Sequence, residues 1–189
     1  MIEIRKIESR IELKAFVKFP FQLYRDNPYW VPPIIKEELE MLDKEVNPVF
    51  QNAIAHYFLA YKEGQIVGRI AAFINWIEVK ELKKNKVRFG WFDAVDDLQV
   101  TEKLMEQVIQ IGQQHQMTAV EGPMGFSNMD KAGMLIEGFE ELNTMITWYN
   151  APYYAQHFEK LGYTKQAEWI EFEIKISSFQ DSPEKVKRF

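Results

Sequence analysis

Two acidic residues, Asp93 and Glu121, are the side chains best placed in the sequence to act as a general base. Each ends or follows an apolar stretch with the pattern of a strand. A carboxylate at a strand end, within a cleft, can have a raised pKa that suits proton abstraction. The alternative is that both are solvated strand-end acids. The sequence leaves both interpretations open.

The stretch FGWFDAVDDLQVTEKL, residues 89–104, predicts a strand that runs into a helix. Phe89, Trp91 and Asp93 alternate with smaller or apolar neighbours and are expected to share one face. A strand that leads into a helix N-terminus often holds a phosphate through glycines and free amides. Here no glycine follows Gly90, and two aspartates are present. The junction is either an altered phosphate site or a helix start capped by Asp96 or Asp97.

The remaining patterns predict a mixed α/β chain. Predicted strands cover 2–7, a hairpin over 56–75, 87–94, 117–123 and 168–176. Predicted helices run from a capping box at Ser9 toward Lys18, with a separate short piece after Pro20, and then over 33–43, 98–115 and 151–163. The expected domain covers 1–176, and 177–189 is expected to be a tail or linker.

Composition excludes several classes of protein. The 189 residues suit one domain, and the net charge of −5 disfavours nucleic-acid binding. The absence of cysteine removes thiolate chemistry, and three scattered histidines give no metal-ligand spacing. We expect no metal, no membrane span and no signal peptide, and hence a cytoplasmic protein.

Three motifs resemble the GNAT superfamily, whose members transfer an acetyl group from acetyl-CoA to an amine. HYFLAYKEGQIVGRIAAFI resembles its central hairpin, and FEKLGY resembles its late helix. FPFQLYRDNPYWVPP and YNAPYYAQHFEKLGY resemble a narrower group of bacterial GNAT-like proteins. Longer members of that group carry a second GNAT-like domain. The resemblance implies a mostly antiparallel mixed sheet, flanked by helices and splayed between strands 87–94 and 118–122.

The resemblance also implies where acetyl-CoA or another acyl-CoA would bind. Its pantetheine arm would lie along the strand end, and its pyrophosphate at the following amides. The implied contacts are Phe92, Ala94, Val95, Leu98, Gln99, Val100 and Thr101, with Asn150 nearby. The sequence departs from the family here, because Asp96 stands at the Arg/Gln position of the pyrophosphate loop. Gln99 and Thr101 stand at its two small positions.

A second departure concerns the proton donor. The family often has a tyrosine four residues before the glycine of its LGY-like motif, and this chain has Phe158. Tyr154, one turn earlier on the same helix face, is the possible substitute. It is also a candidate packing residue.

Two functions follow from these features. The first is N-acyl transfer from acyl-CoA to a small-molecule amine or a protein acceptor. The second is a catalytically degenerate domain that recognises a ligand or partner, or packs on a second domain or a second copy. Residues 124–150, which contain four of the eight methionines, are either a lid or partner surface or irregular core.

Overall fold

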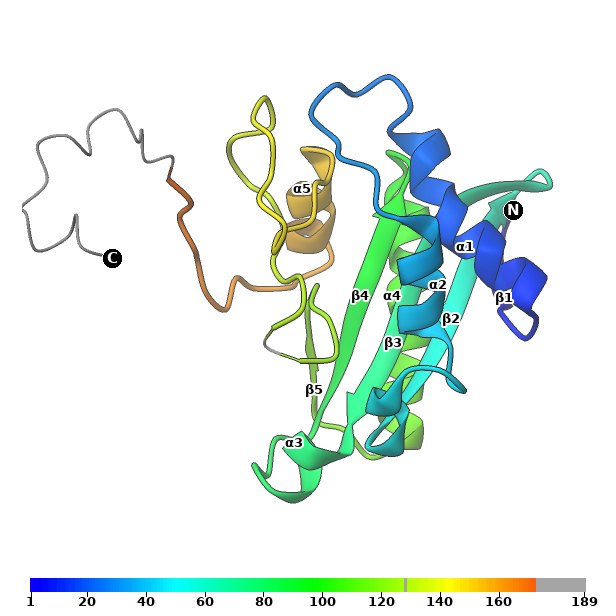
Figure 1. Cartoon of the computed structure of the whole chain (residues 1–189), viewed down its shortest axis with the longest axis vertical. Helices are drawn as coiled ribbons and strands as arrows, with labels where there is room; N and C mark the ends of the chain where they lie inside the picture. Colours follow the sequence, from blue (N-terminus) through cyan, green and yellow to red (C-terminus); the bar gives the residue numbers. More distant parts are fainter. Residues whose placement is uncertain (128, 173–189) are drawn as a thin grey trace, which may run out of the picture.

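The structure is a computed structural model that describes residues 1–127 and 129–172. Within them, one sheet has the strand order β1-β2-β3-β4-β5 (Figure 1). The strands are β1 Ile2–Lys6, β2 Ala53–Lys62, β3 Gln65–Asn75, β4 Lys86–Ala94 and β5 Ala119–Glu121. Neighbours are antiparallel except β4 and β5, which are parallel. The predicted fold, α/β with a mostly antiparallel sheet, is confirmed.

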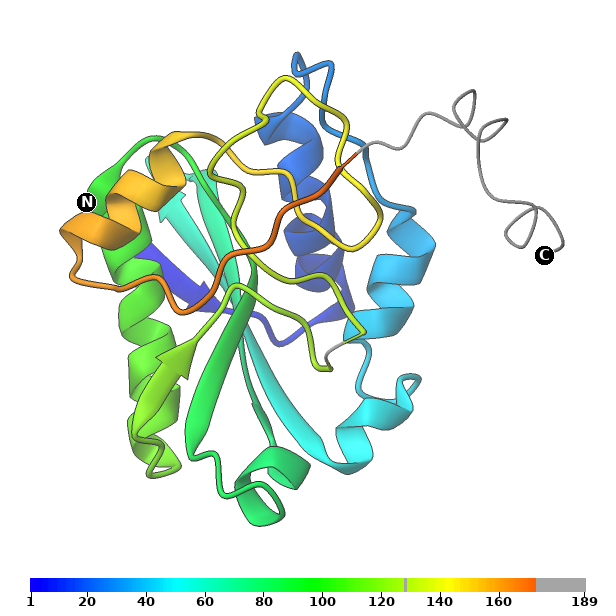
Figure 2. The same ribbon diagram turned by 90° about the vertical axis from the view of Figure 1, so that its left-hand side faces the viewer.

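Helices cover both faces of the sheet (Figure 2). On one face lie α1 Arg10–Leu23 and α2 Ile35–Leu42, and on the other lie α4 Leu98–Gln114 and α5 Tyr153–Lys160. The predicted stripe on α4 is buried: Val100, Leu104, Val108 and Ile111. Short helices, η1 Pro48–Gln51 and α3 Trp76–Lys80, lie at one end of the strands. The hairpin, β4 and α4 therefore form the single packed unit that their periodicities predict.

The helix α1 corrects one prediction. Its capping box is present, since Ser9 Oγ accepts the Glu12 amide while the Glu12 carboxylate accepts the Ser9 amide. The predicted break at Pro20 is wrong, because the helix continues to Leu23. Proline cannot donate to the carbonyl four residues earlier. That carbonyl, on Phe16, accepts instead from Arg69 Nη1 at 3.0 Å, so the defect in the helix is satisfied from the sheet.

A bulge in β4 corrects a second prediction. Arg69 pairs with Asp93 and Ala71 pairs with Gly90, which leaves two residues of β4 opposite one residue of β3. Trp91, in the bulge, has a φ of 45°. Phe89 therefore packs in the core under α4, whereas Trp91 packs in the core under α1 and α2. The expectation that Phe89, Trp91 and Asp93 share one face is wrong, because the bulge reverses the alternation.

The predicted strand 168–176 is not present in the residues that can be described. Residues 164–172 have no regular secondary structure, and Trp169, Ile170 and Phe172 are exposed. Residues 173–176, like the expected tail 177–189, lie outside the described residues. An alternating pattern makes a strand only where a sheet edge accepts it. The domain boundary at 176 thus stays a prediction.

None of the helices in the described ranges combines the length and the apolar composition that a bilayer crossing requires.

Candidate functional site

A buried polar cluster lies where β4 ends. The Asp93 carboxylate accepts from Arg69 Nε at 2.7 Å and from the Tyr24 hydroxyl at 2.8 Å. The hydroxyls of Tyr24 and Tyr154 lie 2.9 Å apart and share a hydrogen bond. Asp93 is 6 % exposed and Tyr154 is 1 % exposed. The structure therefore brings together two of the predicted site residues, Asp93 and Tyr154, and connects them through Tyr24.

Burial dominates the electrostatics of this cluster. It raises the pKa of Asp93, although the Arg69 guanidinium and the hydrogen bonds act in the opposite direction. Burial also raises the pKa of Tyr154 and of Tyr24 well above the usual value, and the neighbouring Asp93 carboxylate adds to both shifts. The result is an acid with a raised pKa beside two phenols that keep their protons.

Four separate elements position the cluster. Arg69 on β3 lies directly opposite Asp93 on β4, and its guanidinium is anchored on the Phe16 carbonyl that Pro20 leaves free. Tyr24 is the C-cap of α1, and Tyr154 lies in the first turn of α5. The bulge in β4 decides that Asp93 points toward α1. Without it the carboxylate would face α4.

The main-chain groups at the end of β4 already have partners. The Ala94 amide donates to the Tyr154 hydroxyl at 2.8 Å, and the Ala94 carbonyl accepts from the Tyr153 hydroxyl at 2.7 Å. The Val95 amide donates to the Val67 carbonyl at 2.9 Å. Phe92 packs edge-on against Tyr154. Two of the predicted donor contacts, Phe92 and Ala94, thus lie against the tyrosines of α5, whereas the Val95 amide is bound to β3.

The N-terminus of α4 is capped by Asp97, one of the two predicted alternatives. Asp97 Oδ1 accepts the Gln99 amide at 3.0 Å, and its carbonyl accepts the amides of Val100 and Thr101. Asp96 does not cap the helix. It lies 3.1 Å from His157 Nε2, while His157 Nδ1 lies 2.9 Å from Thr101 Oγ1. Among the amides of the predicted residues Leu98 to Thr101, three are therefore occupied by Asp97.

A small cavity lies beside the buried cluster. Its volume is about 20 Å³, enough for one water, which needs roughly 10–15 Å³. Asp93, Tyr154, Tyr149 and Asn150 line it. The Asn150 amide is used within the chain, because it exchanges hydrogen bonds with the backbone of Leu135.

A larger, open groove adjoins this cavity. It has a volume of about 470 Å³ and lies between the loop after α1 and residues 139–149, which are side by side in both ribbon views. Asp26, Tyr29, Phe139 and Glu140 line it, and Tyr149 borders both spaces. Among the described residues, those lining the groove carry two carboxylates and no cation, so the groove favours a positively charged ligand.

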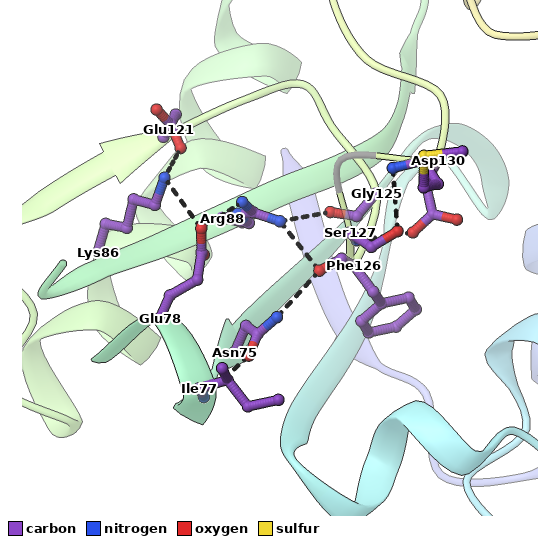
Figure 3. A network of polar contacts seen from close by, with 11 residues as sticks. Asn75, Ile77, Glu78, Lys86, Arg88, Glu121, Gly125, Phe126, Ser127 and Asp130 are labelled. Carbon is purple, nitrogen blue, oxygen red and sulfur yellow. Dashed lines mark hydrogen bonds and ion pairs between the residues drawn. The ribbon is translucent and has the colours of Figure 1, made fainter. Parts of the chain in front are cut away.

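Glu121 belongs to a different cluster (Figure 3). It forms an ion pair with Lys86, which also contacts Glu78 at 3.5 Å. Glu78 in turn accepts from Arg88 Nη2 at 2.6 Å. Arg88 donates through Nη1 to the carbonyls of Gly125 and Phe126. This cluster holds the segment after β5 on the sheet, and the structure does not bring Glu121 to Tyr154.

Sequence reasoning missed several members of these clusters: Arg69, Tyr24 and His157 around the end of β4, and Glu78, Lys86 and Arg88 beside Glu121. Arg69 gave a usable signal, because an arginine within the apolar run VGRIAAF requires a buried partner. Tyr24 and His157 gave none, since their partners are distant in sequence. In the described ranges no group of three or more His, Cys, Asp or Glu side chains could hold a metal ion.

Two curated relatives match nearly the whole chain. Protein YghO of Escherichia coli (strain K12) is 33% identical over 95% of this chain and 46% of its own length. A protein of Caulobacter vibrioides named "Bacterial ceramide synthase" is 27% identical over 99% of this chain and 48% of its own length. The chain thus spans about half the length of the curated relatives it matches. No protein-family model matches it.

Solved structures share the fold at low sequence identity. A predicted acetyltransferase of Clostridium acetobutylicum, solved with acetyl-CoA, is 13% identical with a TM-score of 0.55 and covers 94% of this chain and 98% of its own. An aminoglycoside acetyltransferase from a soil metagenome is 12% identical with a TM-score of 0.52 over 92% and 95%. A tandem GNAT protein of clavulanic acid biosynthesis has a TM-score of 0.56 at 12% identity and covers 86% of this chain but 43% of its own.

Proposed function

The chain has the GNAT acetyltransferase fold, and on that premise we propose that it transfers an acyl group from an acyl-CoA thioester to an amine. The observation that carries the proposal is the buried chain of Asp93, Tyr24 and Tyr154. It lies where β4 separates from β5, whose pairing extends only over Lys86–Arg88. A base with a raised pKa and a protonated phenol are the two groups that this reaction requires.

An acceptor that arrives as an ammonium ion first loses one proton to solvent, and from the neutral amine the proton balance closes within this chain of side chains. The amine nitrogen attacks the thioester carbonyl carbon, the new C–N bond forms, and the C–S bond breaks. Asp93 takes the proton that the nitrogen loses, and Tyr154 gives a proton to the leaving thiolate. Tyr24 bridges the two groups, so a proton can return from Asp93 to Tyr154 after each cycle.

The Ala94 amide has a second role in this scheme. Its N–H is held by the Tyr154 hydroxyl. A thioester oxygen that reached this amide would replace that hydroxyl and gain a donor for its developing negative charge. The released Tyr154 hydroxyl would then be free to approach the sulfur. Binding of the acyl donor at the Ala94 amide would thus also release the Tyr154 hydroxyl to act as the proton donor.

The groove beside Tyr149 supplies a route for the acceptor. Asp26 and Glu140 attract an ammonium group, and the ring faces of Tyr29 and Tyr149 favour it further. The Caulobacter relative is named a ceramide synthase, and ceramide is the amide of a long-chain amino alcohol. Alkyl amino alcohols therefore belong in the acceptor panel beside aminoglycosides.

The test is thiol release from acetyl-CoA and from long-chain acyl-CoA across this amine panel. Asp93→Asn should lower kcat by about 10²–10⁴-fold. Glu121→Gln is the matched control, since it neutralises the other predicted strand-end acid. Its kcat should stay within about tenfold of the wild-type value. Equal losses in both variants would contradict the role of Asp93. No thiol release with any acceptor would contradict acyl transfer itself.

One observation favours recognition as a second function. Large apolar side chains are exposed along the segment after β5, including Met129, Leu142, Met145 and Ile146. Such a concentration is typical of a surface that a partner or a second domain covers. Sedimentation of the wild type against the Leu142→Ser and Met145→Ser double variant tests this. An unchanged monomer in both would speak against self-association through this segment.

A further inference from the structure

The N-terminus of α4 offers little to a diphosphate, because the protein's own Asp97 already fills it. The side chain of Asp97 holds the Gln99 amide, and its carbonyl holds the amides of Val100 and Thr101. The Asp97 amide itself donates to the Val95 carbonyl at 2.7 Å. A phosphate oxygen would have to displace a carboxylate that is bound through several contacts at once.

The charged groups at this corner point to the same conclusion. The second oxygen of Asp97 pairs with Lys62 at 2.8 Å, and this contact holds the pKa of Asp97 below its usual value. Asp96, whose side chain is 69 % exposed, pairs with His157. Both nearby basic groups are thus engaged by carboxylates. A diphosphate at this corner would therefore lie beside two carboxylates, and each basic group there is already paired with one of them.

The end of β4 differs from this corner. There the Ala94 carbonyl, which would receive the pantetheine arm, and the Ala94 amide, which would receive the thioester oxygen, are held by the neutral hydroxyls of Tyr153 and Tyr154. A neutral amide-containing arm can replace a hydroxyl without any change of charge. The two halves of an acyl-CoA therefore meet opposite conditions: the pantetheine half meets neutral groups, and the nucleotide half meets occupied amides and fixed negative charge.

We infer that this site recognises the acyl donor through its pantetheine arm and makes no productive contact with the nucleotide diphosphate. Acyl thioesters of pantetheine that lack the nucleotide then serve as donors as well as acyl-CoA does. This inference rests on the proposed function and keeps the same chemistry: the C–S bond breaks and pantetheine thiol leaves with a proton.

The experiment compares kcat/KM for acetyl-CoA and for S-acetyl-pantetheine with one acceptor amine. Two charge-assisted bonds from amides to a diphosphate would correspond to roughly 10²–10⁴-fold in affinity. We expect the two donors to differ by less than about tenfold. A preference of about 100-fold or more for acetyl-CoA would overturn the inference.

A gain-of-contact variant tests the same point from the other direction. Asp96→Arg should raise kcat/KM for acetyl-CoA by about tenfold or more and leave S-acetyl-pantetheine unchanged, because only the first donor carries phosphate. Glu102→Arg makes the same charge change on an exposed residue of α4 and should have little effect. An equal rise in both variants would show a general charge effect and overturn the local explanation.

Calorimetry with CoA and with pantetheine separates this inference from the proposed function. Equal affinities for CoA and pantetheine, without turnover of either acetyl thioester, would refute acyl transfer. That result would still support recognition through the pantetheine arm. Turnover with much tighter binding of CoA would refute this inference and leave acyl transfer standing. Binding of neither compound would refute both.

Discussion

Tyr154→Phe removes one oxygen atom from the centre of the buried cluster. The phenol is 1 % exposed and accepts the Ala94 amide at 2.8 Å. Phenylalanine keeps the ring and its edge-on contact with Phe92, whose centroid lies 5.0 Å away. The change therefore leaves a buried amide unpaired, which costs about 1–3 kcal/mol. We expect the free energy of unfolding to fall by that amount and the protein to stay folded.

The effect on turnover should be larger than the effect on stability. Loss of a positioned general acid lowers kcat by about 10²–10⁴-fold. Because burial and Asp93 raise the pKa of Tyr154 well above 10.0, the wild-type phenol stays protonated at neutral and mildly alkaline pH. Deprotonation of Tyr154 should therefore not limit activity in that range. The rising limb of the wild-type profile should instead report the raised pKa of Asp93.

Tyr153→Phe is the matched control. The Tyr153 hydroxyl contacts the same residue of β4 but donates to the Ala94 carbonyl. Its loss should lower stability by up to about 1.5 kcal/mol and keep turnover within about tenfold. Thiol-release kinetics and denaturant unfolding measure both quantities. A folded Tyr154→Phe with full turnover refutes the proton-donor role, and equal loss in both variants would assign the effect to the β4 backbone.

Three further outcomes follow from single contacts. Pro20→Ala supplies an N–H that competes with Arg69 for the Phe16 carbonyl. The free energy of unfolding, measured with denaturant, should therefore rise by far less than the ~3 kcal/mol usual for removing a helix proline. A full rise would show that the Arg69 contact contributes nothing to stability. Burial lowers the pKa of His56 to about 4 from 6.5. Between these two values the unfolded chain binds a proton that the folded chain does not, so the free energy of unfolding should fall as the pH drops from 6.5 toward 4. His56→Gln should reduce this pH dependence, and an unchanged pH dependence would contradict the role of His56. Gly90→Ala would place a Cβ 2.3 Å from the Met124 carbonyl oxygen, and its thermal unfolding should show a loss of about 1–3 kcal/mol; unchanged stability would mean that the segment after β5 yields freely.

Local interactions explain why much of the fold could be predicted. The hairpin turn uses Glu63 and Gly64, both with positive φ, and glycine in the sequence KEGQ indicates such a turn. The stripe on α4 and the capping box at Ser9 depend on residues three or four apart. These signals are complete within one segment, so the sequence alone was sufficient for them.

The predictions of a helix break at Pro20 and of strand structure at 168–172 failed for a common reason. Pro20 is tolerated inside α1 because Arg69, forty-nine positions later, donates a hydrogen bond to the Phe16 carbonyl that Pro20 cannot reach. The pattern of Trp169, Ile170 and Phe172 is that of a strand, yet these side chains are exposed and no strand forms at 168–172. In both cases the secondary structure depends on whether a segment distant in sequence supplies a hydrogen-bonding partner. The local sequence pattern carries no information about that partner.

The candidate site shows the same division. The sequence by itself determined that Asp93 ends a strand, that an aspartate caps α4, and that Tyr154 stands on a late helix. Only the tertiary structure decided which carboxylate meets Tyr154. The bulge at Trp91 turns Asp93 toward α1 and Tyr24, while Lys86 engages Glu121 elsewhere. A one-residue bulge reverses the face of every side chain after it, and its position depends on strand pairing rather than on composition.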